Sequence, residues 1–157
     1  MRTYKLVRAI EGKLYPLYVE HTRELTVGEW LEARIGEMAD ATHVKSRNGS
    51  PLSLRPGFHS SLVPFTDWIG KKGPDGRLYQ RKDTVWCECE VEGDVEFVPG
   101  RTGLRRLPQD WYYFKTNSRQ KDPWIISNRI LIRRILSREG VEEICKAHGL
   151  NAQPMEM

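Results

Sequence analysis

The run "TVWCECEV", from Thr84 to Val91, is the clearest strand signal in the chain. In a β-strand, successive side chains point to opposite faces of the sheet. One face of this run therefore carries the valines and cysteines, and the other carries Trp86, Glu88 and Glu90. We expect Cys87 and Cys89 to be buried as small hydrophobic side chains, because alternation places both on the apolar face.

Segments rich in strand-forming residues lie on both sides of this run. Two of them, "TYKLVRAI" and "KLYPLYV", are joined by the short glycine-containing turn "EGK". Asn48-Gly49 is another tight-turn signal. Later in the chain, "WYYFKT" reads as an aromatic strand and "WIISNRILIRRIL" as a long strand with a break near Ser127 and Asn128. These segments together predict a sheet.

The last element of the chain is predicted to be a helix. Ser137 is a suitable N-cap, Val141 and Cys145 recur at helical spacing, and Gly149 is a stop signal. We therefore expect an α+β fold that is mainly an antiparallel sheet with a C-terminal helix packed on one face. It forms a single domain over residues 1–150, followed by a frayed tail over residues 151–157.

The bulk composition is that of a folded protein with a well-charged surface. The chain has 157 residues, of which 39% are hydrophobic and 29% charged, and its length suits one domain. No apolar run is long enough to span a bilayer, and the first residues lack the apolar core of a signal peptide. The three cysteines form no disulfide framework. We therefore expect a cytoplasmic protein that has no membrane partner.

The stretch "LRPGFHSS" presents a lone histidine, His59, after a Pro-Gly bend. An imidazole followed by two hydroxyl side chains can hydrogen-bond the ribose or phosphate of a nucleotide. His59, Ser60 and Ser61 are therefore candidate cofactor-binding residues. The alternative interpretation is that His59 caps a turn by bonding a backbone carbonyl group.

The Glu-x-Glu pair on the predicted central strand is a candidate catalytic site. Glu88 and Glu90 project from one face, roughly 7 Å apart along the strand. Facing a ligand, one carboxylate can hold a ribose hydroxyl while the other orients or deprotonates a nucleophile. The alternative is that both lie on the solvated face of a two-sided strand. No metal is expected, because Cys-x-Cys with one distant histidine lacks the usual zinc spacing.

Arginines and aromatic residues suggest a different kind of site. The net charge of +4 fits an anionic partner such as a nucleic acid, a dinucleotide or an acidic protein. Several basic residues share the loop before the aromatic strand, and others lie on the last strand and at the start of the helix. The candidate partner-binding residues are Arg101, Arg105, Arg106, Tyr113 and Lys115, together with Arg129, Arg133, Arg134 and Arg138. They can form a basic aromatic surface for single-stranded nucleic acid, or they are ordinary surface residues.

Most of the chain, from about Tyr4 to Leu150, resembles a family of uncharacterised proteins from bacteriophages and mobile elements, many of them from gut bacteria. The resemblance is carried by "VKSRNGSPLSLRPGFHSSLVPF", "TVWCECEVE", "YYFKTNS" and "WIISNRILIRRILSREGVEEICKAHG". It implies a protein that works in the host cell cytoplasm, where it acts against host defence.

A more distant resemblance is to the ADP-ribosyltransferase superfamily, through "GFHSS" and "ECE". It implies that His59 holds the nicotinamide ribose of NAD and that Ser60 lines the pocket. Glu90 would stabilise the oxocarbenium-like transition state, and Glu88 would activate the acceptor.

Two hypotheses follow for the function. The first is an ADP-ribosyltransferase-like domain that binds NAD or a related nucleotide. The second is a non-enzymatic binding module that inhibits a host protein or contacts nucleic acid through a basic aromatic face.

Overall fold

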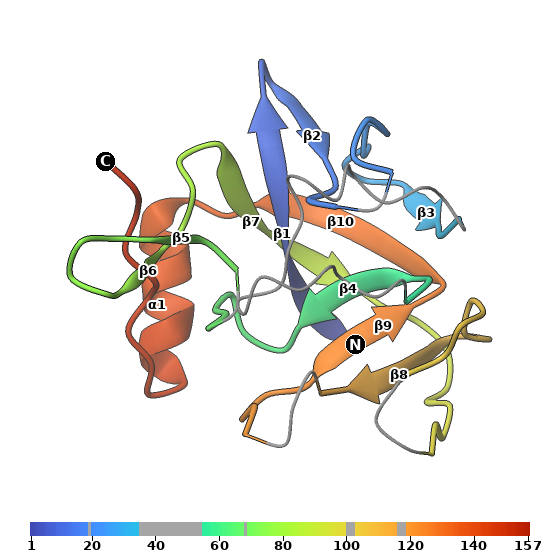
Figure 1. The fold of residues 1–157 in the computed structure, drawn as a ribbon. Coiled ribbons are helices and arrows are strands. Elements are labelled where there is room, and N and C mark those ends of the chain that lie inside the picture. The colour runs from blue at the N-terminus through green and yellow to red at the C-terminus, as the bar shows by residue number, and fades with distance from the viewer. Residues whose placement is uncertain (19, 35–54, 68, 100–102, 116–118) are drawn as a thin grey trace.

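The computed structural model describes residues 1–18, 20–34, 55–67, 69–99, 103–115 and 119–157 of the chain. Asn48-Gly49 and Arg101 lie outside these residues. The elements in the described part are shown in Figure 1: β1 (Arg2–Ile10), β2 (Lys13–Tyr15), β3 (Trp30–Glu32), β4 (Phe58–Ser61), β5 (Lys71–Lys72), β6 (Leu78–Tyr79), β7 (Thr84–Glu90), β8 (Trp111–Phe114), β9 (Trp124–Ser127), β10 (Arg129–Ile135) and α1 (Arg138–Ala147).

The strand predicted from the alternating run is confirmed as β7, and it lies in the middle of the main sheet. One edge pairs with β1 from Arg2↔Glu90 to Arg8↔Thr84, and the other edge pairs with β10. The strand order is β3-β10-β7-β1-β4-β9-β8, with antiparallel pairing between neighbours. The prediction of a mainly antiparallel sheet is therefore confirmed.

The sheet bends back on itself through β9 and β10. These two strands are separated by Asn128 alone, yet β9 pairs with β4 and β8 while β10 pairs with β7 and β3. The sharp corner between them is visible in Figure 1. The predicted break near Ser127 and Asn128 is confirmed.

One face of the bent sheet encloses the main hydrophobic core. Buried side chains from all eight described strands of the main sheet meet there in one cluster. The cluster includes both β7 thiols, and burial raises the pKa of each to about 12. Members of the cluster are Val7, Leu31, Phe58, Cys87, Cys89, Trp111, Ile125, Ile130 and Ile132. The predicted burial of the two cysteines is confirmed.

The opposite face of β1 and β7 is covered by helix α1. Trp86 from β7 and Leu6 from β1 pack there against Val141 and Cys145 of the helix. The predicted N-cap is confirmed, because the Ser137 hydroxyl accepts a 3.0 Å hydrogen bond from the amide of Gly140. In the part of the chain that the structure describes, no helix has the length and apolarity to cross a membrane.

The C-terminal segment differs from the frayed tail predicted over residues 151–157. The amide of Gln80 donates to the carbonyl of Pro154 at 2.7 Å, and the amide of Glu156 donates to the carbonyl of Gln80 at 2.8 Å. Gln153 is buried, and its amide group donates to Ile69. The C-terminal segment is thus held to Gln80 by one short backbone pairing. Such a short pairing produces no periodic pattern in the sequence, so the sequence does not predict it.

A lysine, Lys5 of β1, is buried on the core face of the sheet. Its ammonium group donates a 2.7 Å hydrogen bond to the carbonyl of His59 and lies 5.9 Å from the centre of the Phe58 ring. Directly opposite it on β7 is Cys87. Burial lowers the pKa of Lys5 to about 8, because the charged form loses its hydration.

We expect Lys5→Met to stabilise the fold at pH 7 by up to about 3 kcal/mol. The unfolded chain takes up the Lys5 proton as the pH falls through 10.5, whereas the folded chain takes it up only near pH 8. The native protein therefore loses stability as the pH falls from 10.5 to 8, and the variant lacks this loss. Urea unfolding at pH 7 and pH 10 measures the unfolding free energies of the native protein and the variant. Lys72→Met, at an exposed lysine, is the control. A variant less stable than the native protein at pH 7 would contradict the prediction.

Candidate functional site

The three predicted cofactor-binding residues lie on β4, but they do not share a face. His59 and Ser61 point to the face that carries α1, whereas Ser60 points to the core face with Phe58. Ser60 is fully buried, and within the described residues its hydroxyl has no hydrogen-bond partner. The Ser61 hydroxyl donates to the carbonyl of Val63 at 2.6 Å. These side chains therefore do not converge on one ligand position.

The imidazole of His59 packs against a tryptophan. Its ring centre lies 6.3 Å from that of Trp124, with the two rings edge to face. Burial lowers the pKa of His59 to about 3, and the positive charges of Lys5 and Arg55 add to the effect. The imidazole is therefore neutral at pH 7, able to donate or accept a hydrogen bond but without a proton to give as an acid.

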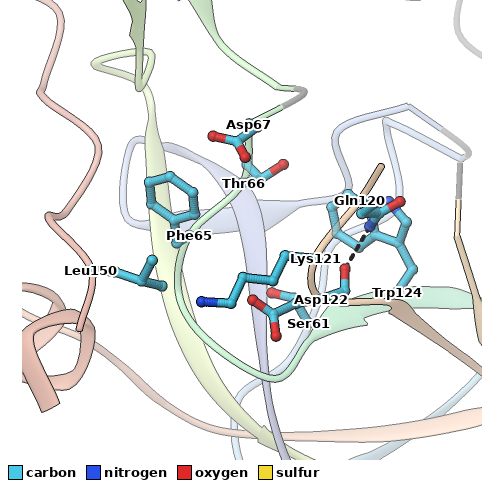
Figure 2. A pocket seen from close by; sticks show the side chains of 9 residues that line it. All are labelled: Ser61, Phe65, Thr66, Asp67, Gln120, Lys121, Asp122, Trp124 and Leu150. Carbon is cyan, nitrogen blue, oxygen red and sulfur yellow. Dashed lines mark hydrogen bonds between the residues drawn. The ribbon is translucent and has the colours of Figure 1, made fainter. Parts of the chain in front are cut away.

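A small pocket opens beside Ser61 and Trp124 (Figure 2). Its volume is about 70 Å³, and Figure 2 shows Phe65 and Leu150 on one side and Trp124 on the other. Its polar lining comes from Ser61, Thr66, Asp67, Gln120, Lys121 and Asp122. The pocket is well below the several hundred Å³ of a typical ligand site, so it does not enclose a whole dinucleotide. Neither His59 nor the two β7 glutamates line it.

The two glutamates share the α1-bearing face with His59 but stand away from it. In the sheet, Glu88 pairs with Tyr4, and Tyr4 pairs with Ser61. Two strand spacings, roughly 10 Å, therefore separate the backbones of Glu88 and Ser61. Tyr4, which is buried, stands between them. His59, Glu88 and Glu90 are therefore on one face, but the structure does not bring the imidazole next to the two carboxylates.

Each glutamate is instead held by basic groups. Glu88 contacts Arg134 at 3.2 Å and Arg2 at 3.7 Å, and Glu90 contacts Arg133 at 3.2 Å and the amino group of Met1 at 3.6 Å. The glutamate side chains are 9% and 21% exposed, whereas the three arginine side chains are 52–66% exposed. The carboxylates thus lie low on the sheet, and the guanidinium groups lie above them and face solvent.

A β-bulge in β10 creates this arrangement. Ile132 pairs with Cys89, and Arg134 pairs with Glu88, so Arg133 is an extra residue between them. In a regular pairing without the bulge, Arg133 would stand opposite Glu88 and Arg134 opposite Cys87, on the core face, because side chains alternate along a strand. The bulge therefore turns two consecutive arginines toward the same face of the sheet.

The row of paired residues continues to an aromatic side chain on the edge strand β3. Arg2 pairs with Glu90, Glu90 with Leu131, and Leu131 with Trp30, so all four lie on one face. Trp30 is partly exposed, and the guanidinium carbon of Arg129 lies 5.1 Å from its ring centre. Arg129 also pairs with Glu92. We use the name arginine face for four exposed arginine side chains and the partly exposed Trp30: Arg2, Trp30, Arg129, Arg133 and Arg134.

Sequence patterns identify only some of the residues of the arginine face. Arg129, Arg133 and Arg134 were candidates, but Arg2 and Trp30 were not. Their position depends on the pairing of β1 and β3 with strands far away in the chain. No local signal in the sequence reports such pairing.

The basic aromatic site predicted around β8 is divided between two sides of that strand. Tyr113 is 50% exposed and packs edge to face on Trp111 at 4.9 Å. The loop that carries Arg105 and Arg106 lies on the other side, where the amide of Leu104 donates to the Tyr112 hydroxyl at 3.1 Å. Arg106 is paired with Glu96 at 2.5 Å. Lys115 is exposed just beyond the strand.

Neither potential metal ligands nor similarity to known proteins points to a further functional site in the described residues. Among the described residues, no three His, Cys, Asp or Glu side chains gather as metal ligands. Comparison of the chain with protein-family models, curated proteins and solved structures finds no match.

We expect the imidazole of His59 to stay neutral through the physiological range. Its ring nitrogen signals in ¹H–¹⁵N NMR spectra should not change between pH 5 and pH 8, because its pKa is lowered to about 3. The unfolded chain takes up this proton near pH 6.5, so the fold should lose stability as the pH falls from 6.5 toward 3. His59→Phe should show a smaller loss. A His59 titration midpoint near 6.5 would show the prediction to be wrong.

Proposed function

We propose that the protein is a non-enzymatic binding module that contacts the phosphate backbone of nucleic acid through the arginine face. The observation that carries the proposal is the bulge at Arg133. It turns Arg133 and Arg134 to the same side as Arg2, beside carboxylates that are less exposed than the guanidinium groups. Bulges often redirect side chains at functional sites.

The charges of the arginine face support this choice of partner. Each guanidinium group has five N–H donors, and the glutamates beneath occupy only some of them. The outward donors remain for phosphate oxygens, which arginine binds in a bidentate manner. Contacts of this kind supply most of the affinity of proteins for nucleic acid.

The ion pairs of Glu88 and Glu90 argue against a catalytic role for these two glutamates. A carboxylate that is to act as a base or nucleophile needs access to its substrate. Glu88 is buried beneath two arginines, and Glu90 lies beneath Arg133 and the amino group of Met1. Their arrangement fits the orientation of arginine side chains better than a reaction with a bound nucleotide.

We expect a fluorescently labelled oligonucleotide to bind with strong dependence on salt. Replacement of Arg133 and Arg134 by Gln should weaken binding on the order of tenfold or more and lower the slope of log K against log salt by about 2. Fluorescence anisotropy at several salt concentrations measures both quantities.

The matched control is the double variant Arg105→Gln, Lys115→Gln, which removes the same charge from the region of β8. It should bind as the native protein does. Equal losses in the two double variants would indicate general charge attraction and overturn the assignment of the face. No binding by the native protein, together with capture of an acidic host protein that depends on Arg133 and Arg134, would overturn the choice of nucleic acid.

The ADP-ribosyltransferase-like hypothesis remains a second proposal, and one observation favours it. The neutral imidazole of His59 packs on Trp124, which lines the pocket together with Ser61. A ribose or nicotinamide group placed there would contact Ser61 and Trp124, and the His59 imidazole would hold the Trp124 indole in position. The likeness to phage proteins fits either proposal, because both are compatible with action against host defence.

This second proposal predicts that NAD or ADP-ribose at 100 times its Kd stabilises the protein by about 2.7 kcal/mol. The resulting rise in melting temperature should disappear in His59→Ala and persist in Arg133→Gln. A thermal-shift assay with both ligands measures it. No shift with either ligand at millimolar concentration would remove the proposal.

A further inference from the structure

Trp30 lies at the end of the arginine face, where its indole adds an aromatic surface to the charged groups. We infer that the nucleic acid bound there is single-stranded and that one of its bases stacks on Trp30 while the arginines hold its phosphates. This inference rests on the proposed function and names the class of nucleic acid.

The position of Trp30 is fixed by the backbone of the sheet. Its pairing with Leu131 places the indole on the same face as Glu90 and Arg2, in a row that crosses the four neighbouring strands β3, β10, β7 and β1. Trp30 therefore lies roughly 14 Å from Arg2, measured between their backbones at three strand spacings. A short stretch of nucleic acid chain can reach from one to the other.

The surroundings of Trp30 differ from those of a core tryptophan. The next residue of β3, Leu31, enters the main core, whereas Trp30 stays partly exposed on the other side. The guanidinium group of Arg129 lies over its ring, and Glu92 holds that guanidinium group in place. The indole is thus held in a defined orientation beside a cation before any partner arrives.

Stacking distinguishes single strands from duplexes. In a duplex the flat faces of the bases are covered by their neighbours, so an indole on the surface of a sheet cannot reach them. An unpaired base exposes its π-face, and aromatic side chains stack on such bases for about 1–3 kcal/mol each. A duplex would meet only the arginines, through its phosphates.

The test compares a single-stranded oligonucleotide with a duplex of the same length at one salt concentration. Trp30→Leu should weaken single-strand binding by roughly 5- to 150-fold. It should leave duplex binding and the salt slope unchanged. Trp30→Phe, which keeps an aromatic ring, should retain most of the affinity. Tyr113→Leu is the control, because Tyr113 is an exposed aromatic residue outside the arginine face.

A second measurement does not depend on whether the variants fold. Ultraviolet cross-linking of a single strand to the native protein, followed by peptide mapping, should attach a base to the peptide that contains Trp30. Absence of that cross-link, or an unchanged single-strand affinity in a folded Trp30→Leu variant, would overturn the inference. If arginine variants still weakened binding, the proposed function would stand. If no oligonucleotide bound the native protein, the proposed nucleic-acid binding and the inferred stacking on Trp30 would both be wrong.

Discussion

The structure depends on β7, whose backbone pairs along both edges while one of its faces enters the main core. Its backbone is hydrogen-bonded along both edges, to β1 and to β10, so it cannot shift by one residue without turning its thiols out of the core. Fixing Cys87 and Cys89 inside also fixes Trp86 beneath α1 and the two glutamates on the face beyond the helix. The positions of Glu88 and Glu90 on that face follow from this one register.

The two glutamates show how the same sequence pattern can serve different chemistry. A carboxylate that is nearly buried is costly unless it is paired, and Glu88 is paired with Arg2 and Arg134. Exposed ion pairs contribute little to stability, about 0–1 kcal/mol each, so the pairs at the rim of this face do little to hold the fold together. Their physical effect is to limit the positions of long arginine side chains, which otherwise lose several rotamers on meeting a partner. A Glu-x-Glu strand is therefore as suited to orienting cations as to catalysis.

The sequence predicted the features that arise within a short stretch of chain. The alternation of β7, the N-cap at Ser137 and the break near Asn128 all depend on neighbouring residues, and each is present in the structure. The features that it did not predict depend on distant pairing. The extra residue in β10 is visible only against the register of β7, and Trp30 joins the arginines only through Leu131. The predicted site around β8 joins residues that are close in sequence, whereas the structure places Tyr113 on one side of the strand and the loop that carries Arg105 and Arg106 on the other.

The single strand β10 links the core to the arginine face. Ile130 and Ile132 enter the core, while Arg129, Arg133 and Arg134 leave from the other side of the same strand. At its first end, the corner at Asn128 is held by hydrogen bonds from its amide to the carbonyl of Asp110 and to its carbonyl from the amide of Ala33, next to β3. The distances between the indole and the guanidinium groups are therefore set by paired backbones rather than by a loop. A surface arranged in this way has little to reorganise on binding, so a larger part of each contact contributes to affinity.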